Sequence, residues 1–422
     1  MLDSQFGTSV EKPDVSGEVV NYFIVTRNRP DLLRACLSSL VAGHESHLNH
    51  LGGRIHVVDD STSRDYRSKV FSLCRHKYNL PVLYLGEASH AALIDEIKSR
   101  TDFRAKSLQS LVGPLGRPGW NVAVARNFAW LFARTHLRET PLYCFLDDDI
   151  QVAAATYLGH RFNPDALNII SDNLRILRSS RPVALGSSFL GRQDVTLSRH
   201  VEIRSRELLR SASSRLRHLN REFPISVANR RTEIDTFDNI PSSGFLVTNY
   251  AAISSAHLCG FYNEDWLWAR LLGSERRAKI ARLKLVALHV APAAACSRAA
   301  ILLQEMGEVF YDALTDSLLQ KPSNEDSIRF VRHHLGKTGL RIAAQDHIAV
   351  LVHRVTTISK AVAALDRSND NRFAPAKKSL GAYLDGIGDA IQKLSAGEYT
   401  KYLAPFHAYL DEIPVWRRLV PE

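Results

Sequence analysis

Three consecutive carboxylates follow an apolar run in the first half of the chain. The run Pro141–Leu146 is rich in leucine and aromatic residues, which is typical of a buried strand, and Asp147, Asp148 and Asp149 come directly after it. Clustered carboxylates raise one another's pKa unless a cation or hydrogen bonds compensate. A hard divalent cation shared with the phosphates of a substrate is one possible compensation. A solvated acidic turn is the alternative.

Other polar clusters occupy equivalent places in the sequence. Thr26–Arg29 follows the first predicted strand, Asp59 and Asp60 end the second, and Asn263–Asp265 opens a predicted helix. In an open α/β sheet, ligands bind at the carboxyl ends of the strands. We therefore expect these clusters to meet the three aspartates at one site.

Strand-like and helix-like segments alternate over the first 295 residues. Predicted strands cover residues 19–26, 54–58, 81–86, 141–146, 182–186, 244–250 and 283–290, and predicted helices cover 32–42, 66–78 and 120–137. This rhythm implies crossover connections and an α/β fold with a mixed, mainly parallel sheet flanked by helices. We expect Asp31 to cap the first helix and Gly43 to end it.

The chain divides into three predicted parts. Residues 1–17 form a loose tail, 18–295 form the α/β domain, and 296–422 form an all-α domain, because apolar residues recur at helical spacing from about residue 297 onward. The segment between Gly86 and Trp120 is long and irregular. The Arg-rich stretch 192–231 is interpreted as an insertion, either a solvated basic surface or a lid that grips an anionic acceptor.

Composition narrows the class of protein. The 422 residues are 45% hydrophobic and carry a net charge of +10, which suits phosphorylated ligands but is only a mild bias. The five cysteines form no C-x-x-C pair and are expected to be buried free thiols. The polar start lacks the apolar core of a signal peptide, and the longest apolar candidate, 285–296, is too short to span a bilayer. We expect a soluble cytoplasmic protein without a membrane span.

Two common phosphate-binding motifs are absent. The sequence contains no G-x-G-x-x-G after the first strand and no G-x-x-x-x-G-K-[ST], which disfavours dinucleotide-binding and P-loop folds. Phosphate binding would therefore depend on a carboxylate-bound metal and on arginines.

The order of the clusters resembles that of the GT-A glycosyltransferases, specifically the inverting family 2. The matching pieces are FIVTRNRPDLLRACLSSL, IHVVDDST, WNVAVARNFAW, CFLDDDI and GFYNEDWLWARLL, followed by VALHVAP. They cover roughly residues 19–295, whereas the C-terminal helical part has no such resemblance. The resemblance implies a nucleotide-sugar donor, with UDP favoured, and Mn²⁺ or Mg²⁺ bound at a D-x-D motif.

The resemblance also implies which residues bind the metal. Asp149 would ligate it, with Asp147 as a further metal residue, and Asp147 or Asp148 would lie nearer the ribose or a metal-bound water. His289 matches a histidine that completes the metal shell in such enzymes. The alternative for His289 is a buried histidine satisfied within an apolar strand.

Further positions are implied to face the donor. Asp59 and Asp60 would bind the nucleoside, although capping of the next helix by Asp60 or Ser61 is an alternative, and Thr26, Arg27 and Arg29 would lie beside the nucleotide. Arg126 would pair with the donor phosphates, or it could form a salt bridge with an acidic strand end. Gly244 would let the donor sugar approach closely.

Transfer with inversion requires a general base that deprotonates the acceptor hydroxyl. Asp265 matches the base of the family, with Glu264 as the fallback; the alternative is that both acids only complement the helix dipole. The acceptor could be a small molecule, a glycan, a lipid-linked intermediate or a peptide, and the C-terminal helices could form a homodimer.

Two other classes of function compete. A nucleotidyl- or phosphotransferase could use the same carboxylates for metal, but it should have a Gly- and Lys-rich first loop where this chain has Thr-Arg-Asn-Arg-Pro. A nucleic-acid-binding protein could use the Arg-rich stretch, but aromatic residues are sparse there, and no nucleic acid is expected as a partner.

Overall fold

The computed structural model describes residues 19–100, 111–116, 122–137, 142–157, 160–164, 166–168, 170–171, 174, 184–192, 235–236, 242–249, 253, 256–258, 264–276, 280–290, 298–368 and 374–419. The predicted tail (1–17) and nearly all of the predicted Arg-rich insertion (192–231) lie outside these residues.

A nine-stranded sheet forms the centre of the described structure, in the order β3-β2-β1-β4-β10-β8-β11-β5, with β9 paired to β11. Its strands are β1 (Val19–Thr26), β2 (Gly52–Asp59), β3 (Val82–Leu85), β4 (Leu142–Asp147), β5 (Ile150–Gln151), β8 (Ala184–Arg192), β9 (Asp235–Thr236), β10 (Ser242–Thr248) and β11 (Ile280–Val290). Strands β1, β2, β3, β4, β8 and β11 run in one direction, and β10 runs against its neighbours β4 and β8. The predicted mixed, mainly parallel α/β fold is confirmed.

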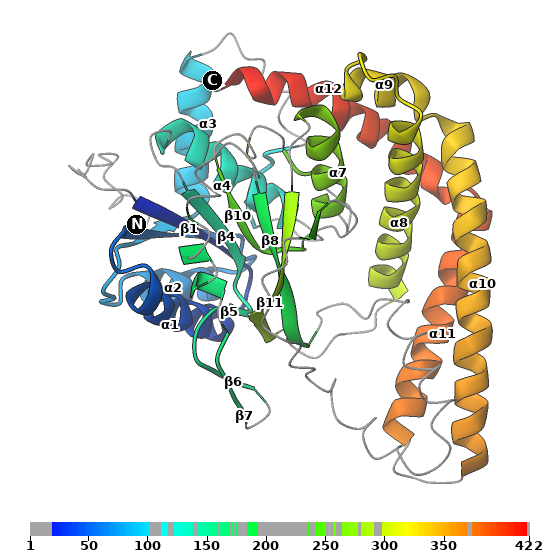
Figure 1. Cartoon of the computed structure of the whole chain (residues 1–422), viewed down its shortest axis with the longest axis horizontal. Coiled ribbons are helices and arrows are strands. Elements are labelled where there is room, and N and C mark those ends of the chain that lie inside the picture. The colour runs from blue at the N-terminus through cyan, green and yellow to red at the C-terminus, as the bar shows by residue number, and fades with distance from the viewer. Residues whose placement is uncertain are drawn as a thin grey trace.

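Helices cover both faces of the sheet (Figure 1). The helices that come before the C-terminal part of the chain are α1 (Pro30–His47), α2 (Arg64–Cys74), α3 (Glu87–Arg100), α4 (Val122–His136) and α7 (Glu264–Arg276). Along β1, Tyr22 and Ile24 join the cluster that α1 supplies with leucines, whereas Phe23 and Val25 join the cluster that includes α4. Because alternate side chains point to opposite faces, a strand covered on both sides is apolar throughout.

Three local predictions are corrected. Helix α1 does not end at Gly43 but continues to His47, and a Cβ at Gly43 would lie 2.8 Å from Leu167 Cδ1, so this glycine permits close packing rather than a helix stop. Asp31 is not the N-cap; Arg29 holds that position and Pro30 opens the helix. The segment after Gly86 was predicted to be irregular, but it begins with α3.

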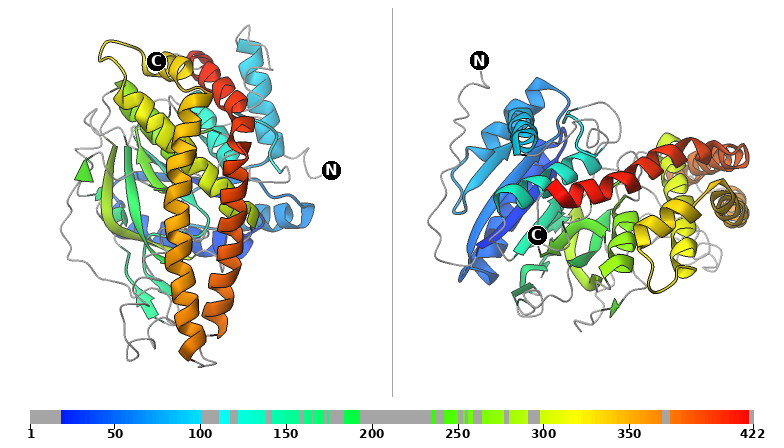
Figure 2. Two further views of the ribbon diagram at one scale, coloured as in Figure 1. Left: turned by 90° about the vertical axis from the view of Figure 1, so that its right-hand side faces the viewer. Right: turned by 90° about the horizontal axis from the view of Figure 1, so that it is seen from above.

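The C-terminal part is helical wherever it is described. It contains α8 (Arg298–Leu319), α9 (Ser327–His334), α10 (Lys337–Ser368), α11 (Ala374–Ser395), the 3-10 helix η6 (Glu398–Tyr402) and α12 (Leu403–Leu419). Helix α12 lies across the ends of α4 and α7, and α10 and α11 form a long hairpin beside the sheet (Figures 1 and 2).

These helices share a core with the sheet. Tyr409 donates to the carbonyl of Ala256 at 2.9 Å and Trp416 Nε1 donates to that of Ile253 at 3.2 Å. One apolar cluster runs from Phe23 to Phe406. The predicted boundary near residue 296 therefore separates chain segments that pack against each other.

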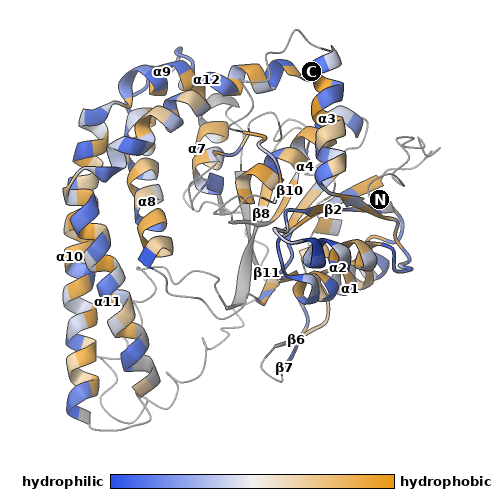
Figure 3. Cartoon of the chain, turned by 180° about the vertical axis from the view of Figure 1, so that it is seen from behind, coloured by the Kyte–Doolittle hydropathy of each residue, from blue (hydrophilic) through white to orange (hydrophobic). Residues whose placement is uncertain are grey.

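Helix α10 is apolar for an exposed helix. Residues 337–367 are long and apolar enough to cross a membrane by length and composition alone, a test that the core helix of a soluble protein also passes. In the most apolar window of this helix, 33% is buried. Ile342, Val350 and Val352 are exposed, and Figure 3 shows such apolar residues alternating with polar ones along the helix. The absence of a membrane span and the homodimer both stay predictions.

Candidate active site

The first three polar clusters meet at one edge of the sheet. In the parallel register, Thr26 of β1 pairs with Asp59 of β2, and Val25 pairs with Asp147 of β4. The side chains that follow these strands are therefore neighbours in space although about 120 residues separate them in sequence. This is the site that the strand ends predicted.

The turn after β1 is fixed by Asn28. Its backbone has φ 57°, the left-handed region that asparagine tolerates better than most residues. Its side-chain oxygen Oδ1 accepts from the backbone amide of Thr62 at 2.9 Å, and its backbone amide donates to Ser61 Oγ at 3.0 Å. These bonds lock the β1 turn to the β2 turn. The sequence analysis did not single out Asn28, although Asn in a turn is the signal that could have found it.

The turn after β1 also holds the middle and last aspartates of the triplet. Thr26 Oγ1 donates to Asp148 Oδ2 at 2.7 Å, and Arg29 Nη1 donates to Asp149 Oδ2 at 2.8 Å. The same guanidinium lies 3.2 Å from Asp148 Oδ1. Compensation of the clustered carboxylates thus comes in part from the protein's own arginine.

His289 lies beside Asp149. Its neighbour Val290 donates its amide to the carbonyl of Asp149 at 2.8 Å, and His289 pairs with Ile150 of β5. This pairing brings His289 Nε2 to 3.2 Å from Asp149 Oδ1. The structure therefore brings together two of the three residues that the resemblance implied for the metal, Asp149 and His289, over a separation of 140 positions in the sequence, whereas Asp147 pairs with Arg126.

The pair fits a divalent cation. Asp149 Oδ1 is buried and accepts no hydrogen bond of good geometry. Its 3.2 Å separation from the imidazole nitrogen is close to the spacing of adjacent ligands on an octahedral ion with bonds of ~2.1 Å. No group of three His, Cys, Asp or Glu side chains with metal-binding geometry occurs among the described residues, so substrate phosphates and water would have to complete the shell.

Burial and charge act differently on the two aspartates. Burial raises the pKa of Asp148 to about 7, and the charge of Asp149 adds to this effect although Arg29 opposes it. Burial would also raise the pKa of Asp149, but the contact with His289 and the charge of Arg29 hold it below its ordinary value. Asp149 is therefore the carboxylate that stays ionised.

Asp147 belongs to a second network. Arg126 Nη2 donates to both of its carboxylate oxygens, at 2.8 and 2.9 Å, while Arg126 Nη1 donates to Glu264 Oε1 at 2.5 Å. Burial would lower the pKa of Arg126, but the two acids raise it, so the guanidinium stays charged. Arg126 thus forms the salt bridge that the sequence analysis gave as the alternative to phosphate binding, and it ties β4 to the start of α7.

The two acids of α7 occupy different environments. Glu264 is 2% exposed and ion-paired with Arg126, and burial raises its pKa well above the ordinary value. Asp265 is half-buried, and its Oδ1 accepts from the amide of Trp266 at 2.9 Å. Trp268 is a core residue that packs edge-on against Trp130 at 5.0 Å. The geometry favours Asp265 over Glu264 for contact with a substrate.

The predicted nucleoside residues Asp59 and Asp60 are both buried. Asp59 accepts from Tyr84 and from the amide of Ser61, both at 2.9 Å, and burial raises its pKa. Asp60 accepts from Arg27 at 2.7 Å and from the amide of Gly116 at 2.6 Å. Neither Asp60 nor Ser61 caps the next helix.

The cap of α2 lies two residues further along the chain. Ser63 Oγ accepts from the amide of Tyr66 at 3.3 Å. The capping alternative for Asp60 and Ser61 was therefore wrong. Asp60 and Ser61 instead bond to the turn after β1, through Arg27 and the amide of Asn28.

Two further residues, Gly244 of β10 and Asn127 of α4, shape the surroundings of the site. Gly244 lies in β10 where the register with β8 shifts, and glycine is typical of such bulges. Asn127, which the sequence analysis did not assign a role, donates to the carbonyls of Leu111 and His257, both at 2.9 Å, and accepts from the amide of His257 at 2.6 Å. It fixes two loops next to Arg126.

Comparison with known proteins gave structural neighbours only. No family model matches the chain, and no curated sequence matches it. Similar solved structures include S. aureus TarS (14% identity, 90% of this chain and 91% of that chain, TM-score 0.37). A mannosyltransferase from Pyrobaculum calidifontis in complex with GDP-Man and Mn²⁺ is another (12% identity, 97% and 91%, TM-score 0.42). Mouse xyloside xylosyltransferase 1 is a third (14% identity, 60% and 72%, TM-score 0.27). These scores are low, so the case for function rests on the site.

Proposed function

We propose that this protein is a metal-dependent inverting glycosyltransferase that moves a sugar from a nucleotide-sugar donor, with UDP favoured, to an acceptor hydroxyl. One observation supports this proposal above the others. The polar residues after β1, β2 and β4, the N-terminus of α7 and His289 of β11 belong to one edge and are joined by short contacts. Arg29 and Arg126 connect the parts of this edge.

Asp149 and His289 are the residues that would hold the cation. When bound, Mn²⁺ or Mg²⁺ would stabilise the negative charge that develops on the departing nucleoside diphosphate. The protein's part is to keep Asp149 ionised and aimed, which the contacts with Arg29 and His289 support. Arg29 is 34% exposed, so its guanidinium can turn from Asp149 toward a phosphate.

Asp265 is the proposed general base. It stands in the first turn of α7, and its neighbour Glu264 is anchored through Arg126 to Asp147. This anchor couples the position of the base to the strand that precedes the metal residue. A base must lie within hydrogen-bond reach of the proton that it removes, so a fixed helix start is what inversion requires.

The first test is thermal-shift titration with UDP, GDP, dTDP and CDP, each with and without Mn²⁺. We expect one nucleotide, UDP, to stabilise the protein, and Mn²⁺ to increase the shift. The matched variant is Asp149→Asn, in which the Mn²⁺-dependent part of the shift should disappear. Equal shifts for all four nucleotides, or a shift that Mn²⁺ leaves unchanged, would contradict the proposal.

A further inference from the structure

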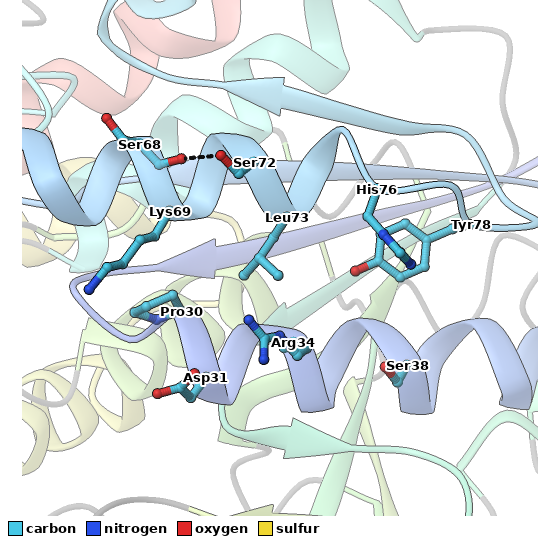
Figure 4. A pocket seen from close by; sticks show the side chains of 10 residues that line it. All are labelled: Pro30, Asp31, Arg34, Ser38, Ser68, Lys69, Ser72, Leu73, His76 and Tyr78. Carbon is cyan, nitrogen blue, oxygen red and sulfur yellow. Dashed lines mark hydrogen bonds between the residues drawn. The ribbon is translucent and has the colours of Figure 1, made fainter.

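A groove separates α1 from α2, on the face of the sheet opposite to α7. Its volume is about 730 Å³, and side chains from both helices project into it (Figure 4). Both helices pack on one face of the sheet, whereas Arg126 of α4 and the start of α7 belong to the other. The groove is therefore separate from the place where Asp265 would meet an acceptor.

The charge of the groove is mostly positive. Among the described residues that line it, Arg34 and Lys69 are cations and Asp31 is an acid. Within the described part of the chain, neither Arg34 nor Lys69 has a carboxylate within ion-pair distance. Two cations against one acid in a concave surface raise the local concentration of anions.

The remaining lining is rich in hydroxyl groups. Ser38 of α1 lines the groove, Ser68 and Ser72 of α2 border it with the Ser72 hydroxyl donating to the carbonyl of Ser68 at 2.8 Å, and Tyr78 closes one end, with its ring edge-on to His76 at 5.3 Å. A hydroxyl both donates and accepts, so such a lining suits a ligand that is itself rich in hydroxyls. Cations and hydroxyls together match a sugar that carries carboxylate or phosphate groups.

We propose that the groove between α1 and α2 binds an anionic saccharide, carboxylated or phosphorylated, at a place distinct from the donor site and from the reacting hydroxyl of the acceptor. The preference for an anion follows from the lining itself, while the choice of a saccharide rests on the proposed function. A nucleic acid fits less well, because single strands bind along grooves with stacking aromatic platforms and here Tyr78 and His76 pack edge-on against each other.

The groove begins next to the edge of the sheet at which Asp148 and Asp149 lie. Pro30 is a lining residue and directly follows Arg29, the partner of Asp148 and Asp149. A saccharide that fills the groove would thus extend from the first turn of α1 toward Tyr78. A long anionic acceptor could be held here by a part remote from the reacting hydroxyl, and such remote contacts contribute to binding and positioning.

The test is calorimetric titration of the full chain at low salt, without nucleotide or metal. The probes are trigalacturonate, glucose 6-phosphate and neutral maltotriose. We expect the two anionic sugars to bind and maltotriose to bind at least about tenfold more weakly. The double variant Arg34→Gln/Lys69→Gln should weaken trigalacturonate by about tenfold or more, since each lost charged contact is worth that order.

The matched control removes two exposed cations from α10, with Arg341→Gln/Lys360→Gln, and should bind trigalacturonate like the wild type. Equal binding of maltotriose, or wild-type binding by the Arg34/Lys69 variant, would overturn the proposal. Tighter binding of a single-stranded RNA oligonucleotide, lost in the same variant, would also overturn it. If trigalacturonate binds but no nucleotide stabilises the protein, the proposed function fails and the anion site stands.

Discussion

Two clusters in this molecule place a carboxylate against a histidine and an arginine. At the edge of the sheet, Asp149 lies 3.2 Å from His289 and 2.8 Å from Arg29. All three come from ends of strands or the turns after them, and each reaches the cluster from a different part of the chain. The cluster is held by the meeting of β1, β4 and β11.

The second cluster lies inside the C-terminal helices. Glu305 of α8 is 2.7 Å from His347 and 3.8 Å from Arg354, both on α10. Burial alone would lower the pKa of His347, but the contact with Glu305 raises it. The composition is the same as at the sheet edge, and the carboxylate is equally buried.

Exposure separates the two clusters. Arg29 and His289 are 34% and 14% exposed, whereas Arg354 and His347 are 9% and 3% exposed. At the edge, a ligand can reach the partners of the carboxylate and replace them. Within the C-terminal helices, the partners His347 and Arg354 are enclosed, so the same kind of ion pair contributes only to the stability of the fold. Residue types alone do not distinguish a site from a structural ion pair.

The largest expected effect comes from Asp149→Ala. Loss of the proposed metal ligand should reduce sugar transfer by roughly 10³-fold, because metal stabilisation of a leaving group is worth several kcal/mol. Stability should change little, since Arg29 can become solvated. Steady-state kinetics and thermal unfolding of the same sample measure both. Unchanged transfer would remove Asp149 from the metal site.

The counterpart in the helices is Glu305→Ala. It leaves His347 and Arg354 buried without their acid, which should cost about 3–5 kcal/mol of unfolding free energy. Urea unfolding measures this cost, and nucleotide binding by the folded fraction should be unaltered. The control Asp385→Ala breaks an exposed ion pair with Arg298 and should cost less than about 1 kcal/mol. Equal losses of unfolding free energy in the two variants would contradict the expected difference between enclosed and exposed ion pairs.

A smaller effect is expected for Arg126→Lys. A lysine keeps the charge but cannot bond Asp147 and Glu264 together, so the start of α7 should lose its anchor. We expect kcat to fall about tenfold with little change in the KM for the donor, because positioning of the base is affected more than binding. Steady-state kinetics with varied donor test this. A large rise in the donor KM would instead favour the direct phosphate role.

The last prediction concerns pH. Burial, then the charge of Glu305, raises the pKa of Glu308 to about 7 from its ordinary 4.5. The folded state therefore binds this proton more tightly than the unfolded state. The resulting stability is fully present below about pH 4.5 and is lost as the pH rises through about 7. The melting temperature should fall between pH 5 and pH 8, and Glu308→Gln should flatten this fall. An identical slope in the variant would contradict the assignment.

Much of the edge was predictable because strand ends have a simple rule. An apolar run that stops at Asp147 or at Asp59 ends its strand there, and parallel strands bring such ends together. The compensation by Arg29 was not predictable. An arginine in a turn can pair with many different carboxylates. Only the register between β1 and β4 places Arg29 beside Asp148 and Asp149.

The errors and omissions have similar physical causes. Gly43 looked like a helix stop, but it serves the close approach of Leu167, a contact that no local pattern reveals. The apolar residues that recur at helical spacing from about residue 297 onward predicted a helix where α8 lies, yet Glu305 within it gave no sign of a buried pair. Its histidine partner is 42 residues away, and tertiary packing alone decides that they meet.

The most direct measurement is nucleotide release from UDP-sugars by the wild-type chain, with Mn²⁺ and then with excess EDTA. We expect UDP release that requires the metal and that increases when an acceptor is supplied. Release that continues unchanged in EDTA would contradict the proposed role of the edge formed by Asp149 and His289. So would the absence of release from every nucleotide sugar by a protein that is folded and holds Mn²⁺.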